Sequence, residues 1–190
     1  MSDAVQICNR ALQRLGAKRI TSLTQDVPNA RSCNFAYEPV RDAELRAHTW
    51  SCAVKRAQLA EDSTEPLFGK SARFALPSDF LRLLPLDPVQ NDNTFDYQIE
   101  AGYIYTNYTA PLNIRYVYRL ESVPLMDTLF REALSMRLAM ELCEEITQSN
   151  TKLQLLQDDY KRVLREARRV NAIERVAQDP PDDTWITVRN

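Results

Sequence analysis

The sequence predicts a mainly helical α+β protein, in which a helical bundle carries an inserted small antiparallel β domain and an extended C-terminal arm. Apolar residues recur at helical spacing over residues 1–60 and 121–178, which we expect to form the bundle. Between residues 61 and 120 the apolar period changes to two and aromatic residues concentrate, which predicts the β insertion. Two consecutive prolines then end the helical pattern, so residues 179–190 are expected to form the arm.

Composition is ordinary for a globular protein. The 190 residues are 44% hydrophobic and 26% charged, and the net charge of -2 favours no particular class of partner. No run approaches the ~18 apolar residues of a membrane span, and residues 1–5 lack the layout of a secretory signal. We therefore expect no membrane contact and a location in the cytoplasm of the cell that makes the chain. The four cysteines are far apart without a CxxC pair and are expected to be reduced core thiols.

Two helices are predicted in the first 60 residues. The first covers residues 3–15 with one apolar stripe, and Gly16 is its expected stop. The second begins at Asp26 or Pro28, where Asp can cap and Pro is tolerated in the first turn. Its apolar stripe comprises Ala36, Val40, Ala43, Ala47, Trp50 and Val54. Pro39 predicts a kink or a break near residues 35–39.

Strands are predicted within the insertion at 71–76, 94–100, 103–106 and 112–120, with 78–82 as a short turn or helix start. The last three strands are expected to form a meander, turned at Ala101-Gly102 and at 107–111. In the last strand, Tyr116 and Tyr118 share one face. This pattern fits packing of the sheet on the helices, and alternatively a base-stacking platform for nucleic acid.

Two further helices are predicted after the insertion. Pro124 is expected to open the third helix, which carries apolar stripes on two sides and should therefore lie at the centre of the bundle. Ser149, Asn150 and Thr151 are expected to break and recap the chain. The fourth helix then presents an apolar face inward, comprising Leu153, Leu156, Tyr160, Val163, Ala167 and Val170.

The outer face of the fourth helix is basic, with Lys161, Arg162, Arg165, Arg168 and Arg169. A run of this kind is typical of a solvated face with intrahelical partners such as Asp158 and Glu166. The alternative is contact with an acidic partner or with nucleic acid phosphates through Arg162, Arg165, Arg168 and Arg169.

The sequence offers no catalytic set, metal site or cofactor site. The chain has three glycines, none of them clustered, so a phosphate-binding loop is not expected. His48 has no partner residue for metal binding or nucleophilic catalysis in its sequence neighbourhood. The adjacent carboxylate pairs, such as Glu144-Glu145, point about 100° apart on a helix and cannot share a substrate.

The C-terminal arm carries three large apolar residues, Trp185, Ile186 and Val188, beyond the prolines. Chain ends are rarely ordered unless tied down, and an apolar end with a tryptophan is typical of a docking segment. We expect the arm to dock on another subunit. The alternative is that it folds back on its own domain.

Several stretches, in this order, resemble tail tubular protein A, the head-to-tail adaptor or connector family of short-tailed phages. They are residues 7–16, 37–42 with Leu45 and Trp50, 76–82, 99–107, 110–116 and 138–142. The resemblance implies a helical bundle with a small β domain, and a ring of about twelve copies between the portal protein and the tail nozzle protein. The genome, double-stranded DNA, passes through the lumen of such a ring during ejection, which implies transient contact with DNA and a location in the virion.

In that family the C-terminal helix and tail bind the portal. The resemblance therefore implies portal contacts at Val170, Ile173, Trp185, Ile186 and Val188. Two other classes remain open at this stage. One is a small DNA- or RNA-binding regulator that uses the basic face of the fourth helix, and the other is a hydrolase built on a carboxylate pair.

Overall fold

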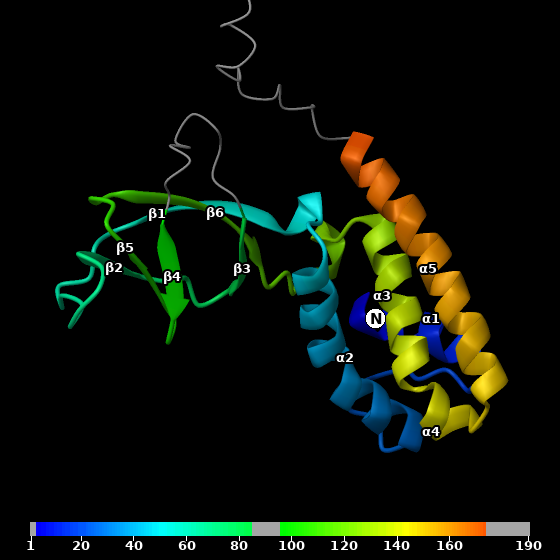
Figure 1. Ribbon diagram of the computed structural model, residues 1–190. Helices are drawn as coiled ribbons and strands as arrows, with labels where there is room; N and C mark the ends of the chain where they lie inside the picture. The colour runs from blue at the N-terminus through cyan, green and yellow to red at the C-terminus, as the bar shows by residue number, and fades with distance from the viewer. Residues whose placement is uncertain (1–2, 85–95, 174–190) are drawn as a thin grey trace, which may run out of the picture.

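The computed structural model describes residues 3–84 and 96–173, which form a helical body and a β lobe that projects from it (Figure 1). The described residues are a mixture of helices and two antiparallel sheets, as the sequence predicts. The strands lie between the second and third helices in the chain. The predicted arm at residues 179–190 lies outside the described residues.

The helical body is built from α1 (Asp3–Leu15), α2 (Pro28–Ala47), α3 (Thr128–Glu141), α4 (Cys143–Thr147) and α5 (Asn150–Ile173). Helix α3 contacts α1, α2 and α5 and has buried residues on several sides, which confirms its predicted central position. Its buried residues include Phe130, Ala133, Leu134 and Leu138. A helix that is apolar on two sides is stable only when neighbouring helices cover both sides.

The ends of the helices follow local signals. Gly16 ends α1 with φ 75°, a left-handed conformation that glycine adopts without steric cost. Gln148 ends α4 in the same region with φ 50°, and α5 begins at Asn150 as expected. The prediction that Pro124 opens the third helix is wrong. Pro124 lies in the short 3-10 helix η3 (Val123–Leu125), and α3 begins at Thr128 because the Asp127 carboxylate accepts hydrogen bonds from the Leu129 and Phe130 amides.

The second helix ends earlier than the sequence predicts. Helix α2 runs through Pro39 without a break but stops at Ala47, and His48 is extended. Trp50 turns into the core, where its Nε1 donates to the Glu44 carbonyl at 3.2 Å and its ring lies 5.1 Å from that of Phe130. These long-range contacts compete with continuation of the helix. After a 3-10 turn at Ser51–Ala53, strand β1 (Val54–Leu59) begins before the predicted boundary at residue 61.

The six described strands form two sheets rather than one meander. One sheet has the order β1-β6-β3, with β3 at Phe80–Leu84 and β6 at Leu112–Tyr118. The other has the order β2-β5-β4, with strands at Ala72–Ala75, Tyr103–Thr106 and Tyr97–Glu100. The predicted turn at 78–82 is therefore wrong for Phe80 to Arg82, which belong to β3. The β4–β5 hairpin turns at Ala101-Gly102, as predicted, with φ 47° and 84°.

Strand β6 shows why the meander prediction fails. It pairs antiparallel with β1 and with β3, so that Val54 lies opposite Val117 and Leu59 lies opposite Leu112. One face buries Leu112, Ile114 and Tyr116 in a core inside the lobe, whereas Val117 is buried against the helices. Strand β6 contributes to both cores, and its partners β1 and β3 also contribute to the helical core. Strand β5, the preceding strand in the sequence, contributes only to the core of the lobe.

The tyrosines of β6 pack inside the lobe. Tyr116 stacks on Phe80 with ring centroids 5.8 Å apart, and its hydroxyl donates to Asp79 at 2.9 Å. Burial and this hydrogen bond raise the pKa of Tyr116 to about 12. The alternative of a base-stacking platform requires accessible ring faces, which Tyr116 does not offer because it is buried.

A pair of phenylalanines tests the position of the helical core. Phe130 is fully buried beneath Trp50, whereas Phe35 on α2 is 86% exposed. We expect Phe130→Ala to lower the free energy of unfolding by about 3–5 kcal/mol through lost contacts and a cavity. Phe35→Ala, the same chemical change, should alter it by less than about 0.5 kcal/mol. Urea denaturation followed by circular dichroism measures both values, and equal losses would contradict the assigned core.

Candidate docking surface

The C-terminal end of α5 presents an apolar surface, and the prediction that Val170 faces inward is wrong, because the neighbouring elements bury α5 only as far as Ala167. Ile173 is 73% exposed, Val170 is more than one third exposed, and Leu125 of η3, which no sequence argument singled out, is 64% exposed. Trp185, Ile186 and Val188, the other predicted docking residues, lie outside the described residues. We call the surface formed by Leu125, Val170 and Ile173 the α5-end surface.

A pocket of about 230 Å³ opens at the α5-end surface, between α5, η3 and the junction that follows α2. The polar side chains at its edge are Ser51, Asp127 and Asn171. Its apolar lining comprises Trp50, Cys52, Leu125, Met126, Leu129, Ala167 and Val170. Polar and apolar groups contribute about equally to its lining, and its volume is below the roughly 300–1,000 Å³ of most ligand pockets.

The end of α5 is fixed to the junction by Asn171. Its Oδ1 accepts hydrogen bonds from the Ser51 amide at 2.9 Å and the Ser51 hydroxyl at 2.6 Å, and its Nδ2 donates to the Thr49 carbonyl at 2.8 Å. These three bonds join residues 120 or more positions apart in the chain. The last described turn of α5 is therefore held in place next to the lobe. In the sequence, Asn171 follows the buried Ala167 by one helical turn. A polar residue on the buried face of a helix indicates a hydrogen-bonded contact, so the role of Asn171 could have been predicted.

Beneath this surface lies a buried polar cluster around Glu44 of α2, whose side chain is fully buried. The Tyr160 hydroxyl from α5 donates to Glu44 Oε2 at 2.7 Å, and Arg137 from α3 lies 3.8 Å from the same oxygen. Burial raises the pKa of Glu44, although Tyr160 and Arg137 partly offset this effect. Burial and the neighbouring Glu44 in turn raise the pKa of Tyr160 to about 12.

His48 sits between Glu44 and α5. Arg168 Nη2 lies 2.6 Å from His48 Nδ1, and because a guanidinium can only donate, the ring must offer a lone pair and is therefore neutral. Burial, together with the charges of Arg168, Arg82 and Arg137, lowers the pKa of His48 to about 4. His48 thus has a structural position, with Glu44 Oε1 4.0 Å from its Nε2.

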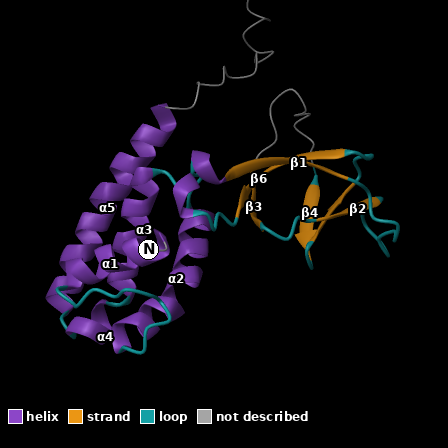
Figure 2. Cartoon of the chain, turned by 180° about the vertical axis from the view of Figure 1, so that it is seen from behind, coloured by secondary structure: helices purple, strands orange, loops and turns teal. Residues whose placement is uncertain are grey.

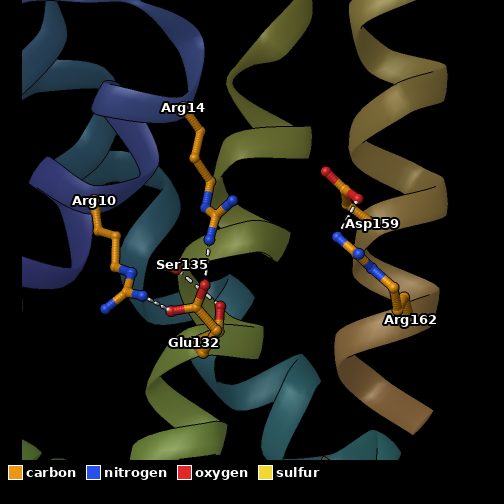
Figure 3. A network of polar contacts seen from close by, with 6 residues as sticks. All are labelled: Arg10, Arg14, Glu132, Ser135, Asp159 and Arg162. Atoms are coloured by element: carbon orange, nitrogen blue, oxygen red, sulfur yellow. Dashed lines mark hydrogen bonds and ion pairs between the residues drawn. The ribbon is translucent and has the colours of Figure 1, made fainter. Parts of the chain in front are cut away.

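The basic face of α5 is largely paired within the protein. Lys161 lies 3.2 Å from Asp158, and Arg162 lies 2.8 Å from Asp159, as Figure 3 shows for the latter pair. Arg168 contacts His48, and Arg165 donates to the Lys161 carbonyl at 3.3 Å. The predicted pairing with Asp158 is confirmed. These contacts favour a solvated helix face over a phosphate-binding face.

A second polar network joins α1 to α3 away from the docking surface. Arg10 and Arg14 of α1 converge on Glu132 of α3, and the Ser135 hydroxyl donates to the Glu132 carbonyl at 2.8 Å (Figure 3). The two arginines also line a polar hollow with Gln6, Asn9, Gln13 and Arg19. Because Glu132 neutralises part of this positive charge, we assign the network to helix packing.

Within residues 3–84 and 96–173, no group of three or more His, Cys, Asp or Glu side chains is placed to hold a metal ion. No helix in this part of the chain is long and apolar enough to cross a membrane. Cys8, Cys33 and Cys143 are buried and Cys52 is half-buried, and none of the four is in a disulfide. The prediction of reduced thiols in the core therefore holds for the first three.

Comparisons with protein-family models and with curated proteins find no match to this chain.

His48 gives a test of the polar cluster. A histidine whose pKa is lowered in the folded state stabilises the fold above its unfolded pKa of about 6.5 and loses that contribution as pH falls towards about 4. We therefore expect His48→Gln to lower the Tm at pH 7.5, and the gap from the unaltered protein to shrink as pH falls to 4.5.

Glu44 acts in the opposite direction, because a raised carboxyl pKa stabilises the fold at low pH and this contribution is lost as pH rises. Both proteins carry Glu44, so the difference in their Tm values isolates His48. Thermal unfolding followed by circular dichroism across this range measures it. A gap that stays constant from pH 7.5 to 4.5 would show that His48 is not held neutral.

Proposed function

We propose that the chain is a structural virion protein, a head-to-tail adaptor that forms a ring of about twelve copies between the portal and the tail nozzle. It would act in the neck of the virion after assembly in the host cytoplasm, and it would let double-stranded DNA pass during ejection. The ordered series of motifs that resembles phage adaptors supports this function. So does an architecture that offers contact surfaces at two separated ends.

The observation that carries the proposal is the α5-end surface. Ile173 projects an apolar side chain from the last described turn of a helix that Asn171 and Tyr160 fix to the body. A rigid apolar helix end loses little conformational entropy when a partner covers it, so more of its apolar contact contributes to affinity. We assign the portal contact to Val170 and Ile173, together with Trp185, Ile186 and Val188 further along the chain.

The β lobe supports a second contact. It projects from the helical body, as both Figure 1 and Figure 2 show, and has its own core around Phe74 and Ile104. Strand β4 lies at the edge of its sheet with all four residues exposed. An adaptor must bind two different proteins on opposite sides. We therefore assign the tail nozzle to the lobe.

The proposed function requires weak adhesion to DNA and no catalysis. The paired cations of α5 and the net charge of -2 both reduce attraction for phosphates. We expect the full chain to show no binding to duplex DNA at micromolar concentration and physiological salt, measured by fluorescence anisotropy. Micromolar or tighter binding with a steep dependence on salt would instead favour the regulator that reads phosphates through Arg162, Arg165, Arg168 and Arg169.

The portal contact is tested at Ile173. We expect Ile173→Asp to weaken co-assembly with portal rings by at least about tenfold per contact, because burial of an isoleucine contributes roughly 1.5–3 kcal/mol. Leu155→Asp is the matched control, since Leu155 is 64% exposed on the same helix but away from its C-terminal end. Co-sedimentation and electron microscopy of the protein mixed with portal measure both.

Truncation after Gln178 removes the other assigned residues. It should leave the Tm of the body within a few degrees of its normal value while strongly weakening assembly with the portal. Unfolding of the truncated chain would show that the C-terminal segment belongs to its own core. Full assembly of both Ile173→Asp and the truncated chain would place the portal contact elsewhere.

A further inference from the structure

The loop between β1 and β2 presents two apolar side chains to solvent at the end of the lobe. Leu67 is 97% exposed and Phe68 is 88% exposed, more than any other large apolar residue among those described. We call these two residues the lobe knob. Isolated exposed apolar residues are common on protein surfaces, but two adjacent ones at the tip of a projecting loop are typical of a contact site.

The loop holds the knob in a defined conformation. Asp62 pairs with Arg73 at 2.9 Å and accepts a hydrogen bond from the Thr64 amide, so the beginning of the loop is fixed to β2. Gly69 has φ 88°, which turns the chain directly after Phe68, and Lys70 then pairs with Asp96. The turn directs Phe68 outward at a small entropic cost to any partner that covers it.

The pocket at the α5-end surface has the size and lining that suit such a side chain. Its volume is about 230 Å³, and its walls include Trp50, Leu129 and Val170. A cavity of roughly 150 Å³ lined by aliphatic and aromatic residues is large enough for benzene. By volume, the pocket can therefore accept a phenyl ring.

The charged residues near the knob and near the pocket are opposite in sign. Glu61 and Glu65 are exposed on the loop that carries the knob, whereas Arg168 and Arg169 are exposed on α5 next to the pocket. The one acidic residue in the pocket lining, Asp127, is occupied in capping α3. Carboxylates near the knob would therefore approach Arg168 and Arg169, which lie between the lining residues Ala167 and Val170 in the sequence, and this favours one orientation of the contact.

The loop between β1 and β2 lies at the end of the lobe away from the helices (Figures 1 and 2), whereas the pocket lies where the lobe joins the helical body. They can meet only between two chains. Each chain has one knob and one pocket on different surfaces, so the contact is head-to-tail. It leaves one knob and one pocket unused in an open assembly and none in a closed ring.

We propose that Phe68 of one chain inserts into the pocket lined by Trp50, Leu129 and Val170 of a second copy of this chain. This interaction would join neighbouring copies in the proposed ring. It rests on the proposed function only in the assumption that the copies close into a ring. Of the described residues assigned to the portal, Val170 lines the pocket and would also contact Phe68, whereas Ile173 does not line it.

Cys52 lines the pocket and is the only one of the four cysteines that is not buried. Its thiol can therefore be used to detect a cysteine that enters the pocket. Phe68→Cys places a thiol on the knob. We expect the full chain with this substitution to form a ladder of disulfide-linked dimers, trimers and longer species after mild oxidation with oxidised glutathione. Mass spectrometry should identify the link between residues 52 and 68.

Three comparisons make the test decisive. Phe35→Cys places a thiol at an equally exposed phenylalanine on α2 and should give no comparable ladder. Adding Cys52→Ser to Phe68→Cys should abolish it, and Phe68→Asp should reduce self-association in sedimentation velocity at high concentration. Dimers linked through residue 68 alone, or a ladder no stronger than that of Phe35→Cys, would overturn the contact.

The contact and the adaptor function can fail separately. Portal binding without the 52–68 link would overturn only the contact between copies. A 52–68 ladder in a protein that never binds portal rings would overturn only the adaptor function. Circular dichroism of each variant confirms folding, which substitution at an 88% exposed side chain should leave intact.

Discussion

The arrangement of the helical body depends on one buried carboxyl group, that of Glu44. It receives a hydrogen bond from Tyr160 of α5 and lies near Arg137 of α3, while its backbone carbonyl receives the indole N–H of Trp50. Elements from the first and last thirds of the chain therefore meet at one residue. Burial of a carboxylate is costly, and removing a single partner from such a group is more destabilising than the pair is stabilising. The cluster thus restricts the body to the arrangement in which every partner is present.

The contacts of Glu44 also affect the surface of the molecule at the junction between the body and the lobe. Because Trp50 must reach the Glu44 carbonyl, the chain leaves the helical conformation at His48 and enters β1 shortly afterwards. The same junction then supplies Thr49 and Ser51 to Asn171, which fixes the end of α5. One buried polar cluster therefore links the position where the lobe leaves the body to the shape of the pocket beside α5. Such coupling keeps the surfaces of the body and of the junction in fixed relative positions.

Local signals made part of this fold predictable. The bounds of α1, the stop at Gly16 and the hairpin turn at Ala101-Gly102 follow from residues only a few positions apart. Features set by distant residues could not be read in the same way. The helical stripe that reaches Trp50 and Val54 in the sequence continues beyond the actual helix, because the Trp50 contacts override it. The partners of β6 depend on which strands lie on either side of it in space, and a period of two carries no information about pairing across the chain.

The docking surface was partly predictable for a similar reason. Val170 and Ile173 were chosen because the resemblance to phage adaptors implies a contact at the end of the last helix, whereas the apolar period alone placed Val170 on the inward face. Leu125 and the pocket could not, since they come into contact with α5 only when η3 folds beneath it. The lobe knob was also missed, because a Leu-Phe pair within a loop fits neither a helical nor a strand period. A search for apolar residues between turn-forming residues, here Pro66 and Gly69, would have found it.

The distribution of charge on α5 weakens its attraction for phosphate groups. The cations of α5 are exposed, yet Lys161 and Arg162 each pair with a carboxylate of the same helix, Asp158 and Asp159 respectively. An exposed ion pair contributes little to stability, usually less than about 1 kcal/mol, so these pairs are poorly explained as stabilising elements. Their stronger effect is on the field around the helix, since a cation next to a carboxylate attracts a passing phosphate less than an isolated one does. Helix α5 can therefore remain rich in arginine, which suits long helices and their solubility, while keeping only weak attraction for a polyanion.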